Sequence, residues 1–205
     1  MKSKLTLWLT AILALSVVQF ASAQGKAEAA NLARQCAQAA KDQNWDRAVE
    51  ECRKAADLDH KFAPNLAIAY EQRGFALQKE QRFAQAIADF TEALKISPRD
   101  ARIYEQRAAV EMKSNAYDQA LADYSEAIKL KPDEIRYYLY RGYIYEIKQD
   151  VTNSMADTEK ALKIQPKNPE ALARKERLQK MQASQTGLPP SPVQIPAQPA
   201  PAKTP

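Results

Sequence analysis

Apolar and polar residues alternate with a helical period along most of the chain, from about residue 29 to residue 168. One complete unit, residues 101–134, contains two such helical patterns separated by a short polar stretch. Its apolar residues follow one another at intervals of three and four, which places them on one face of a helix. Sliding this unit by 34 residues in either direction superimposes its small, aromatic and proline residues on those of its neighbours. Self-similarity at this period predicts a solenoid of helical hairpins.

Four repeats can be placed on this pattern. The apolar series of the second helix begins at Trp45, Phe83, Tyr117 and Val151. The predicted repeats are residues 29–62, 67–100, 101–134 and 135–168. Ala63–Leu66 are extra residues between the first two repeats, and we expect them to form a loop. Prolines at positions 98, 132 and 166 follow the second helix and end it, because proline cannot donate a hydrogen bond and clashes with the preceding turn.

Small residues recur where the two helices of a hairpin should cross. Gly74, Ala108 and Gly142 share one position of the first helix, and alanines recur on the second helix at 86 and 93 and at 120 and 127. The absence of bulk at these positions lets two antiparallel helices approach closely, while aromatic residues fill the outer gaps. We therefore predict an all-α fold with the recurring Phe and Tyr residues in its core.

The last three repeats each carry an arginine followed 16 residues later by an aspartate. The pairs are Arg73 with Asp89, Arg107 with Asp123, and Arg141 with Asp157. The midpoints, at residues 81, 115 and 149, fall in the predicted turns, and residues equidistant from a hairpin turn face each other. This predicts three ion pairs that fix helix register while contributing little net stability. The alternative is that these arginines bind an acidic ligand.

The two cysteines follow the same geometry, since Cys36 and Cys52 are each eight residues from Asn44 in the first predicted turn. In an oxidising compartment they are placed to form a disulfide that locks the first hairpin. Closing a loop of about 15 residues would stabilise the fold by roughly 3 kcal/mol. The alternative is a pair of reduced cysteines in the core. With two cysteines and one histidine, a metal site rich in these residues is excluded by count.

A further helix is predicted after the fourth repeat, where Asn168, Pro169 and Glu170 supply an N-cap, a first helical residue and a first-turn acid. We expect residues 169–183 to form a capping helix that closes the last repeat. Its predicted packing face consists of Leu172, Leu178 and Met181, and its predicted charged face of Arg174, Lys175, Arg177 and Lys180.

The composition changes at residue 184, and residues 187–205 contain seven of the twelve prolines. We predict that residues 184–205 form a disordered tail that samples polyproline II. Such a tail can act as a spacer, as a ligand for a groove, or as a tether to an envelope assembly.

The N-terminal sequence predicts a secretory signal peptide. Lys2 and Lys4 precede an apolar-rich stretch, residues 5–20, and Ala21-Ser22-Ala23 supplies small residues at a cleavage site, so we predict residues 1–23 to be removed. An uncleaved membrane anchor is the alternative, but 16 residues fall short of the roughly 20 that span a bilayer. The short leader looks bacterial. We therefore expect a periplasmic or secreted protein, with no stable membrane insertion after cleavage.

The offsets of aromatic, small and proline residues resemble the tetratricopeptide repeat (TPR). The resemblance covers residues 29–168 and implies a right-handed superhelical solenoid of about four repeats plus the capping helix, within a domain of residues 24–183. It also implies that the first helices line a groove for an extended peptide or partner helix. Mapped onto this chain, the groove residues are Gln72, Phe75, Arg102, Glu105, Gln106, Met112, Arg136, Tyr140 and Tyr143. The alternative for these positions is an ordinary solvated surface.

Chaperone-binding members of that family hold a peptide carboxylate with a set of Lys, Asn and Arg side chains. The corresponding positions here are Glu71, Phe75, Gln106, Arg136 and Tyr140. Only Arg136 keeps a positive charge, so the resemblance does not extend to that mode of binding.

Charge and composition narrow the functional classes. The chain has 30 basic and 25 acidic residues, for a net charge of +5, and loss of Lys2 and Lys4 with the leader lowers this to +3. Because the basic residues are interleaved with acidic ones, we expect no nucleic-acid binding. No nucleophile–base set, glycine-rich phosphate loop or metal-ligand spacing is present in the sequence, which argues against an enzyme and against a cofactor. We expect a protein-binding scaffold or adaptor, with tethering through the tail as the alternative.

Overall fold

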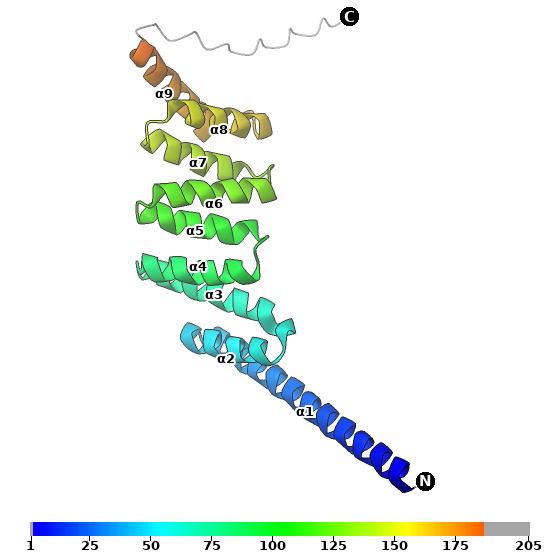
Figure 1. Cartoon of the computed structure of the whole chain (residues 1–205). Helices are drawn as coiled ribbons and strands as arrows, with labels where there is room; N and C mark the ends of the chain where they lie inside the picture. The colour runs from blue at the N-terminus through cyan, green and yellow to red at the C-terminus, as the bar shows by residue number, and fades with distance from the viewer. Residues whose placement is uncertain (1, 187–205) are drawn as a thin grey trace, which may run out of the picture. The chain divides into compact units, whose positions relative to one another are not determined.

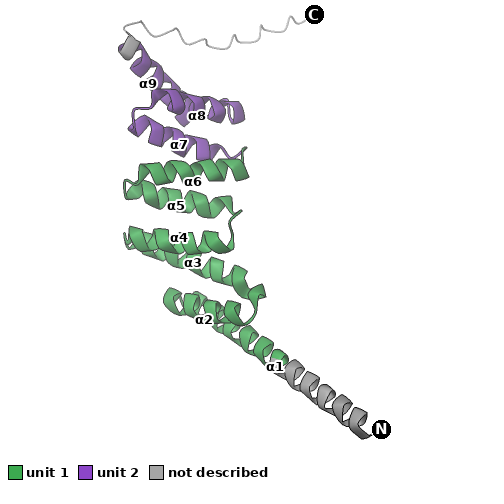
Figure 2. Cartoon of the chain, viewed as in Figure 1, with its two compact units in different colours: residues 1–132 green, residues 133–205 purple. Residues whose placement is uncertain are grey.

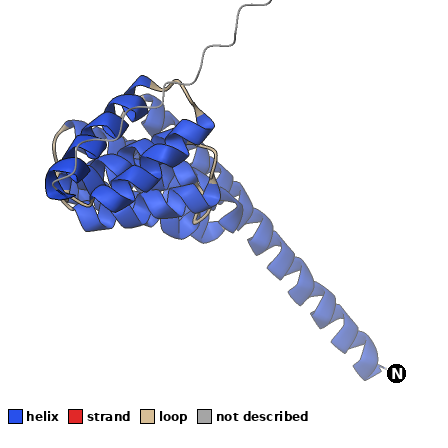
Figure 3. Ribbon diagram, turned by 90° about the horizontal axis from the view of Figure 1, so that it is seen from above, coloured by secondary structure: helices blue, strands red, loops and turns tan. Residues whose placement is uncertain are grey.

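The structure is a computed structural model that describes residues 2–186, with side chains for residues 22–184. Within these residues all regular secondary structure is helical, which confirms the predicted all-α class (Figures 1 and 3). The elements are α1 (Lys2–Lys41), α2 (Trp45–Leu58), the 3₁₀ helix η1 (His60–Phe62), α3 (Ala63–Lys79), α4 (Phe83–Ile96), α5 (Ala101–Lys113), α6 (Tyr117–Leu130), α7 (Ile135–Ile147), α8 (Val151–Ile164) and α9 (Pro169–Thr186). Residues 184–186, predicted to begin the tail, continue α9; the rest of the predicted tail lies outside the described residues.

The chain divides into two compact units, residues 1–132 and 133–205 (Figure 2). Unit 1 contains three helical hairpins, α1–α2, α3–α4 and α5–α6. Unit 2 contains the hairpin α7–α8 and the helix α9, which packs mainly on α8 and also contacts α7.

The first helix, α1, continues without a break through Ala23, where signal cleavage is predicted. The sequence from Lys2 to Lys41 contains no proline that would interrupt it. Ala29, the predicted start of the first repeat, is fully buried. Among the described residues, no helix combines the length and the apolar character that crossing a bilayer requires.

Each hairpin turns through one residue in the left-handed backbone region. These residues are Gln43, Gln81, Asn115 and Gln149, with φ of 57°, 60°, 61° and 59°. The next residue donates its N–H back into the first helix, as Arg82 N does to Leu77 O at 2.9 Å. This geometry satisfies carbonyls that the end of a helix leaves unpaired. The last three of these residues are the predicted midpoints of the Arg–Asp pairs.

Close approach of the helices explains the small residues. In the α3–α4 hairpin, Ala86 and Ala93 are fully buried, and a Cβ added to Gly74 would lie 3.0 Å from the ring of Phe90. That distance is too short for a normal carbon–carbon contact, so any larger residue at position 74 would displace the buried ring. The predicted pairing of small residues with a core aromatic is therefore present in the structure.

The prediction of a loop at Ala63–Leu66 is wrong, because these residues form the first turn of α3. The connection from α2 is made instead by η1, and Asp59 accepts a hydrogen bond from Lys61 N at 3.2 Å. Pro64 lies in the first turn of α3, where its missing N–H costs nothing because first-turn donors have no partner within the helix. The extra residues lengthen a helix rather than a loop.

The predicted faces of α9 are also partly wrong. Leu178 is fully buried, as expected, but Leu172 is 48% exposed and Arg174 is only 1% exposed. The guanidinium of Arg174 lies against Gly142, where an added Cβ would be 3.1 Å from Nη1. Nη1 donates to Leu139 O at 2.7 Å, Nη2 donates to Glu170 at 2.8 Å, and Nε lies 3.3 Å from Glu146. The missing side chain of Gly142 makes room for the arginine, and these oxygens compensate its burial.

Candidate functional site

The nine predicted groove residues fall on both units, and each unit presents its own surface. On unit 1, Gln72 and Phe75 lie on α3, and Arg102, Glu105, Gln106 and Met112 lie on α5. On unit 2, Arg136, Tyr140 and Tyr143 lie on α7. We call these surfaces the first-helix face of unit 1 and the first-helix face of unit 2.

A polar network joins α3 and α5 on unit 1. Glu71 on α3 is buried and accepts a hydrogen bond from Gln106 Nε2 at 3.0 Å. Arg102 Nη2 lies 3.5 Å from Glu71 and 3.2 Å from Asp100, which also caps α5. The buried Oε1 of Gln106 has no hydrogen-bond donor among the described residues. Gln106 and Arg102 thus connect neighbouring hairpins, and one buried acceptor remains unused.

Phe75 and Met112 belong partly to the core. The ring of Phe75 packs edge to face on Phe90, with centroids 5.6 Å apart, and Met112 Sδ accepts a hydrogen bond from Tyr124 Oη at 3.6 Å. Both side chains are half-buried. Their contacts lie within their own hairpins, so they offer less free surface than the sequence suggested.

An apolar cleft between α1 and α3 was missed by the sequence reasoning. It has a volume of about 260 Å³, and no charged side chain lines it. Its lining residues are Ala33, Cys36, Ala37, Ala40, Trp45, Asn65, Ile68, Ala69 and Gln72. Ile68 is 56% exposed, and of the lining residues only Gln72 was among the predicted groove residues. Reading the groove positions of the irregular first repeat would have identified Ala33, Ala37 and Ala40.

The first-helix face of unit 2 is aromatic. Tyr140 and Tyr143 are 43% and 45% exposed, whereas Tyr138 is buried in the core, which raises the pKa of its phenol. Ile147, one turn beyond Tyr143, is also exposed. Arg136 pairs with Glu134 at 3.1 Å. The three exposed apolar residues follow one another at helical spacing and form a stripe along α7.

All three predicted Arg–Asp pairs are present in the structure. Nε to Oδ2 distances are 2.7 Å for Arg73–Asp89, 2.6 Å for Arg107–Asp123 and 2.9 Å for Arg141–Asp157, and each pair has a second hydrogen bond. The hydrogen bond to the aspartate raises the pKa of each guanidinium. Arg73 also binds Asp46 of the preceding hairpin at 3.0 Å, and Arg107 donates to Thr91 at 2.9 Å. These partners favour a structural function for the arginines over binding of an acidic ligand.

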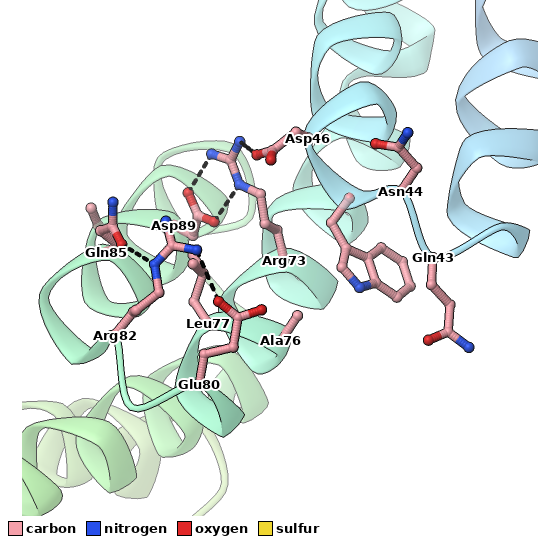
Figure 4. A pocket seen from close by; sticks show the side chains of 12 residues that line it. Gln43, Asn44, Asp46, Arg73, Ala76, Leu77, Glu80, Arg82, Gln85 and Asp89 are labelled. Carbon is pink, nitrogen blue, oxygen red and sulfur yellow. Dashed lines mark hydrogen bonds and ion pairs between the residues drawn. The ribbon is translucent and has the colours of Figure 1, made fainter.

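A second cavity on unit 1 lies beside the turns of the first two hairpins. It has a volume of about 590 Å³. Figure 4 shows its charged side chains directed toward one another: Arg73 toward Asp46 and Asp89, and Arg82 toward Glu80. Because the arginines that line it are already paired with carboxylates, this cavity is a weak candidate for a ligand site.

The first hairpin contains the predicted disulfide, which joins Cys36 on α1 to Cys52 on α2. Cys36 also lines the apolar cleft, so the cross-link fixes one wall of it. Among the side chains that the structure describes, no group of three or more His, Cys, Asp or Glu residues is arranged to hold a metal ion.

Comparison with known proteins identifies the repeat. The tetratricopeptide repeat matches residues 67–100 and 135–168, and a related TPR repeat description matches residues 110–149. None of the curated proteins compared matches the chain.

Solved structures agree on the fold. The Arabidopsis OM64 TPR domain is 27% identical, with a TM-score of 0.53, and the match covers 58% of this chain and 98% of that domain. The second TPR domain of human RPAP3, solved in complex with the HSP70 peptide SGPTIEEVD, is 24% identical, with a TM-score of 0.52 and coverage of 56% and 97%. The first TPR domain of human RPAP3 is 22% identical, with a TM-score of 0.54 and coverage of 60% and 98%. At these two lower identities the likeness concerns the fold alone.

Proposed function

We propose that this tetratricopeptide repeat protein is a non-catalytic interaction module that binds a peptide segment of a partner protein on its first-helix faces. The observation that carries the proposal is the uncovered apolar and aromatic surface on those faces. Ile68 projects beside an uncharged cleft on unit 1, and Tyr140 and Tyr143 are exposed on unit 2. Large aromatic side chains at the surface are typical of residues that contribute most to binding energy.

The chemistry of unit 1 suits an apolar side chain of the bound segment. The cleft between α1 and α3 supplies alanine and isoleucine walls, and the carboxamides of Asn65 and Gln72 lie among its lining residues. Carboxamides can both donate to and accept from the main chain of an extended peptide.

The complex of a human RPAP3 domain with an HSP70 peptide supports peptide binding by this fold, but not the same recognition chemistry here. Glu71 occupies a position where the chaperone-binding pattern needs a cation, and it is buried and bonded to Gln106, which holds another of those positions. A peptide carboxylate would meet a second carboxylate at this place. We therefore propose recognition of an internal, apolar segment rather than a free C-terminus.

Peptide selection tests the proposal directly. Random peptides displayed on phage are selected on the full mature protein, and the affinity of a selected peptide is measured by fluorescence polarisation. Because truncating a central interface residue often costs 2 kcal/mol or more, Tyr143→Ala with Arg136→Ala should weaken binding by at least about 30-fold while leaving the helical circular dichroism unchanged. An affinity equal to that of the wild type would falsify the assignment of the unit 2 face.

A matched control lies on the same unit but off the first-helix face. Leu172→Ala with Lys163→Ala also removes one exposed apolar and one exposed basic side chain. These changes should leave the affinity within about twofold, because neither residue lies on α7. For unit 1, Ile68→Ser probes the cleft in the same assay.

We also propose that the protein is exported and acts in a bacterial envelope. The leader pattern of residues 1–23 and a disulfide in the first hairpin support this setting, since disulfides persist in oxidising compartments. Intact-mass measurement of protein from the periplasm should give the mass of a chain that begins at Gln24. A full-length mass in a membrane fraction would contradict cleavage.

A further inference from the structure

We infer that the proline-rich segment, residues 187–205, docks on the stripe formed by Tyr140, Tyr143 and Ile147 of α7 in the same molecule. The stripe lies on unit 2, and in the sequence the segment directly follows α9 of the same unit. The stripe lies on the proposed binding face, so the docked segment competes with the partner peptide. The docking itself stands on the geometry of unit 2, and only its regulatory consequence rests on the proposed function.

The stripe has the chemistry that proline-rich ligands select. Its three side chains are among the few large apolar residues that remain exposed among the described residues, and none of the three is charged. Grooves that bind proline-rich segments are lined with aromatic side chains, which pack on the flat pyrrolidine rings. From Tyr140 to Ile147 the stripe covers seven residues, or about 10.5 Å along the helix.

The sequence of the segment complements this surface. Residues 187–202 contain no charged side chain, and Lys203 is the first one. A polyproline II helix has three residues per turn and rises about 3.1 Å per residue, so residues three apart share a face. Pro190, Val193, Pro196 and Pro199 fall on one such face. One turn rises about 9.3 Å, close to the length of the stripe, so two prolines of one face can contact it together.

The end of α9 lies within reach of the stripe. Arg174 Nη1 bonds to Leu139 O at 2.7 Å, and Arg177 Nε bonds to Glu146 at 2.9 Å, which places the middle of α9 beside α7. Thr186 follows Arg177 by nine residues of helix, or about 14 Å. Five extended residues cover that return distance, whereas the 19-residue segment can extend to about 59 Å.

Tethering makes weak docking effective. A short flexible connection gives an effective concentration in the millimolar range, so an intrinsic dissociation constant of about 100 µM already keeps the face mostly covered. A second copy of the chain or an external partner could present similar chemistry only at its much lower free concentration. The segment of the same molecule is therefore the favoured occupant.

Site-specific photocrosslinking in the full mature chain tests the inference. Tyr143 is replaced with p-benzoylphenylalanine, the protein is irradiated, and tryptic peptides are analysed by mass spectrometry. The expected product joins α7 to the tryptic peptide 181–203, with fragmentation placing the link within residues 188–202. Its yield should not change between about 1 and 100 µM protein, because the reaction is intramolecular. Pro190→Ser, Pro196→Ser and Pro199→Ser together should lower the yield at least threefold.

The control places the same photoreactive residue at Leu172, which is equally exposed but lies on α9. Equal yields of the tail crosslink from positions 143 and 172, no crosslink to residues 188–202 from position 143, or a yield that rises with protein concentration would each overturn the inference. A selected phage peptide should bind the triple proline variant at least threefold more tightly than the wild type. If no peptide binds any variant but the intramolecular crosslink forms, the docking stands and the proposed function fails. If a selected peptide binds but no intramolecular crosslink forms, the proposed function stands and the docking fails.

Discussion

Glu111 should make the stability of the repeat domain depend on pH in a direction opposite to most surface carboxylates. This residue on α5 is only 5% exposed. Its nearest cation, Arg107, is already held by two hydrogen bonds to Asp123 at 2.6 and 2.7 Å, and Arg107 Nε is 3.9 Å from Glu111 Oε1. Glu111 Oε2 has no hydrogen-bond partner among the described residues. One guanidinium therefore faces two carboxylates.

Burial, together with the charge of Asp123, raises the pKa of Glu111 to about 7 from its ordinary value of 4.5, against the lowering effect of Arg107. The folded state consequently binds a proton more tightly than the unfolded state. Stability is greatest below about pH 4.5 with respect to this group, falls as the pH rises toward 7, and then levels off. A difference of one pKa unit between the folded and unfolded states corresponds to about 1.4 kcal/mol. The difference of about 2.5 for Glu111 therefore lowers the free energy of unfolding by about 3 kcal/mol at pH 8.

Glu111→Gln keeps the side-chain shape and removes the titration. In urea unfolding followed by circular dichroism, with the disulfide intact, the variant should be more stable than the wild type by about 3 kcal/mol at pH 8. Any effect of the new amide itself is present at every pH, so the decisive quantity is the stability difference at pH 8 minus that at pH 4.5. Other titrating groups are common to both proteins and cancel in this comparison.

Glu176 provides the matched control, because it is exposed and its pKa is lowered by a hydrogen bond to Lys180. Glu176→Gln should change stability little at any pH, since exposed ion pairs contribute little to stability. If Glu111→Gln and wild type differ by the same free energy at pH 4.5 and pH 8, then Glu111 ionises normally and the reasoning from burial is wrong. A ¹³C NMR titration of the Glu111 carboxyl would locate the midpoint independently.

Three further changes should alter stability, each measured by urea unfolding. Gly142→Ala forces a Cβ to within 3.1 Å of Arg174 Nη1 and should cost about 1–3 kcal/mol, whereas Gly25→Ala, with nothing within 4 Å, should not destabilise. Asp157→Asn removes the carboxylate charge that faces Arg141 and should cost about 3 kcal/mol, more than the double change Arg141→Met with Asp157→Leu. Replacing both cysteines with serine should cost about 3 kcal/mol through loss of the cross-link, and the oxidised wild type should weigh two hydrogens less than the reduced form.

The hairpin architecture was predictable because it depends on local periodicity. A period of 34 residues places the turns, and residues equidistant from a turn must meet whatever the rest of the chain does. The Arg107–Asp123 pair and the Cys36–Cys52 disulfide follow from this symmetry about the turns without any knowledge of packing. The helices lie close to their predicted positions wherever small and aromatic residues recur regularly.

The failures concern positions where burial is decided by a neighbour distant in sequence. The pattern of its own helix predicts that Arg174 is exposed. Its guanidinium is buried because the missing side chain of Gly142 leaves room for it. Glu111 occupies the position held by Leu77 and Tyr145 in other repeats, and its burial follows from that place rather than from its chemistry. The cleft beside Ile68 was missed because the groove positions were mapped onto the last three repeats and not onto the irregular first repeat, which supplies one of its walls.

The first-helix residues divide into those that join repeats and those that remain for a partner. Gln106 bonds to Glu71 and Arg174 bonds to Leu139, and in both cases 35 residues separate the two ends. Each unit therefore has a hydrogen bond between residues 35 apart, but the chemical groups differ. On unit 1 an amide donates to a carboxylate, and on unit 2 a guanidinium donates to a main-chain carbonyl. A residue committed to such a link cannot change without disturbing the neighbouring repeat. Ile68 and Tyr143 stay exposed on the same helices, so they are free to vary with the partner, and a change of binding specificity should be sought there first.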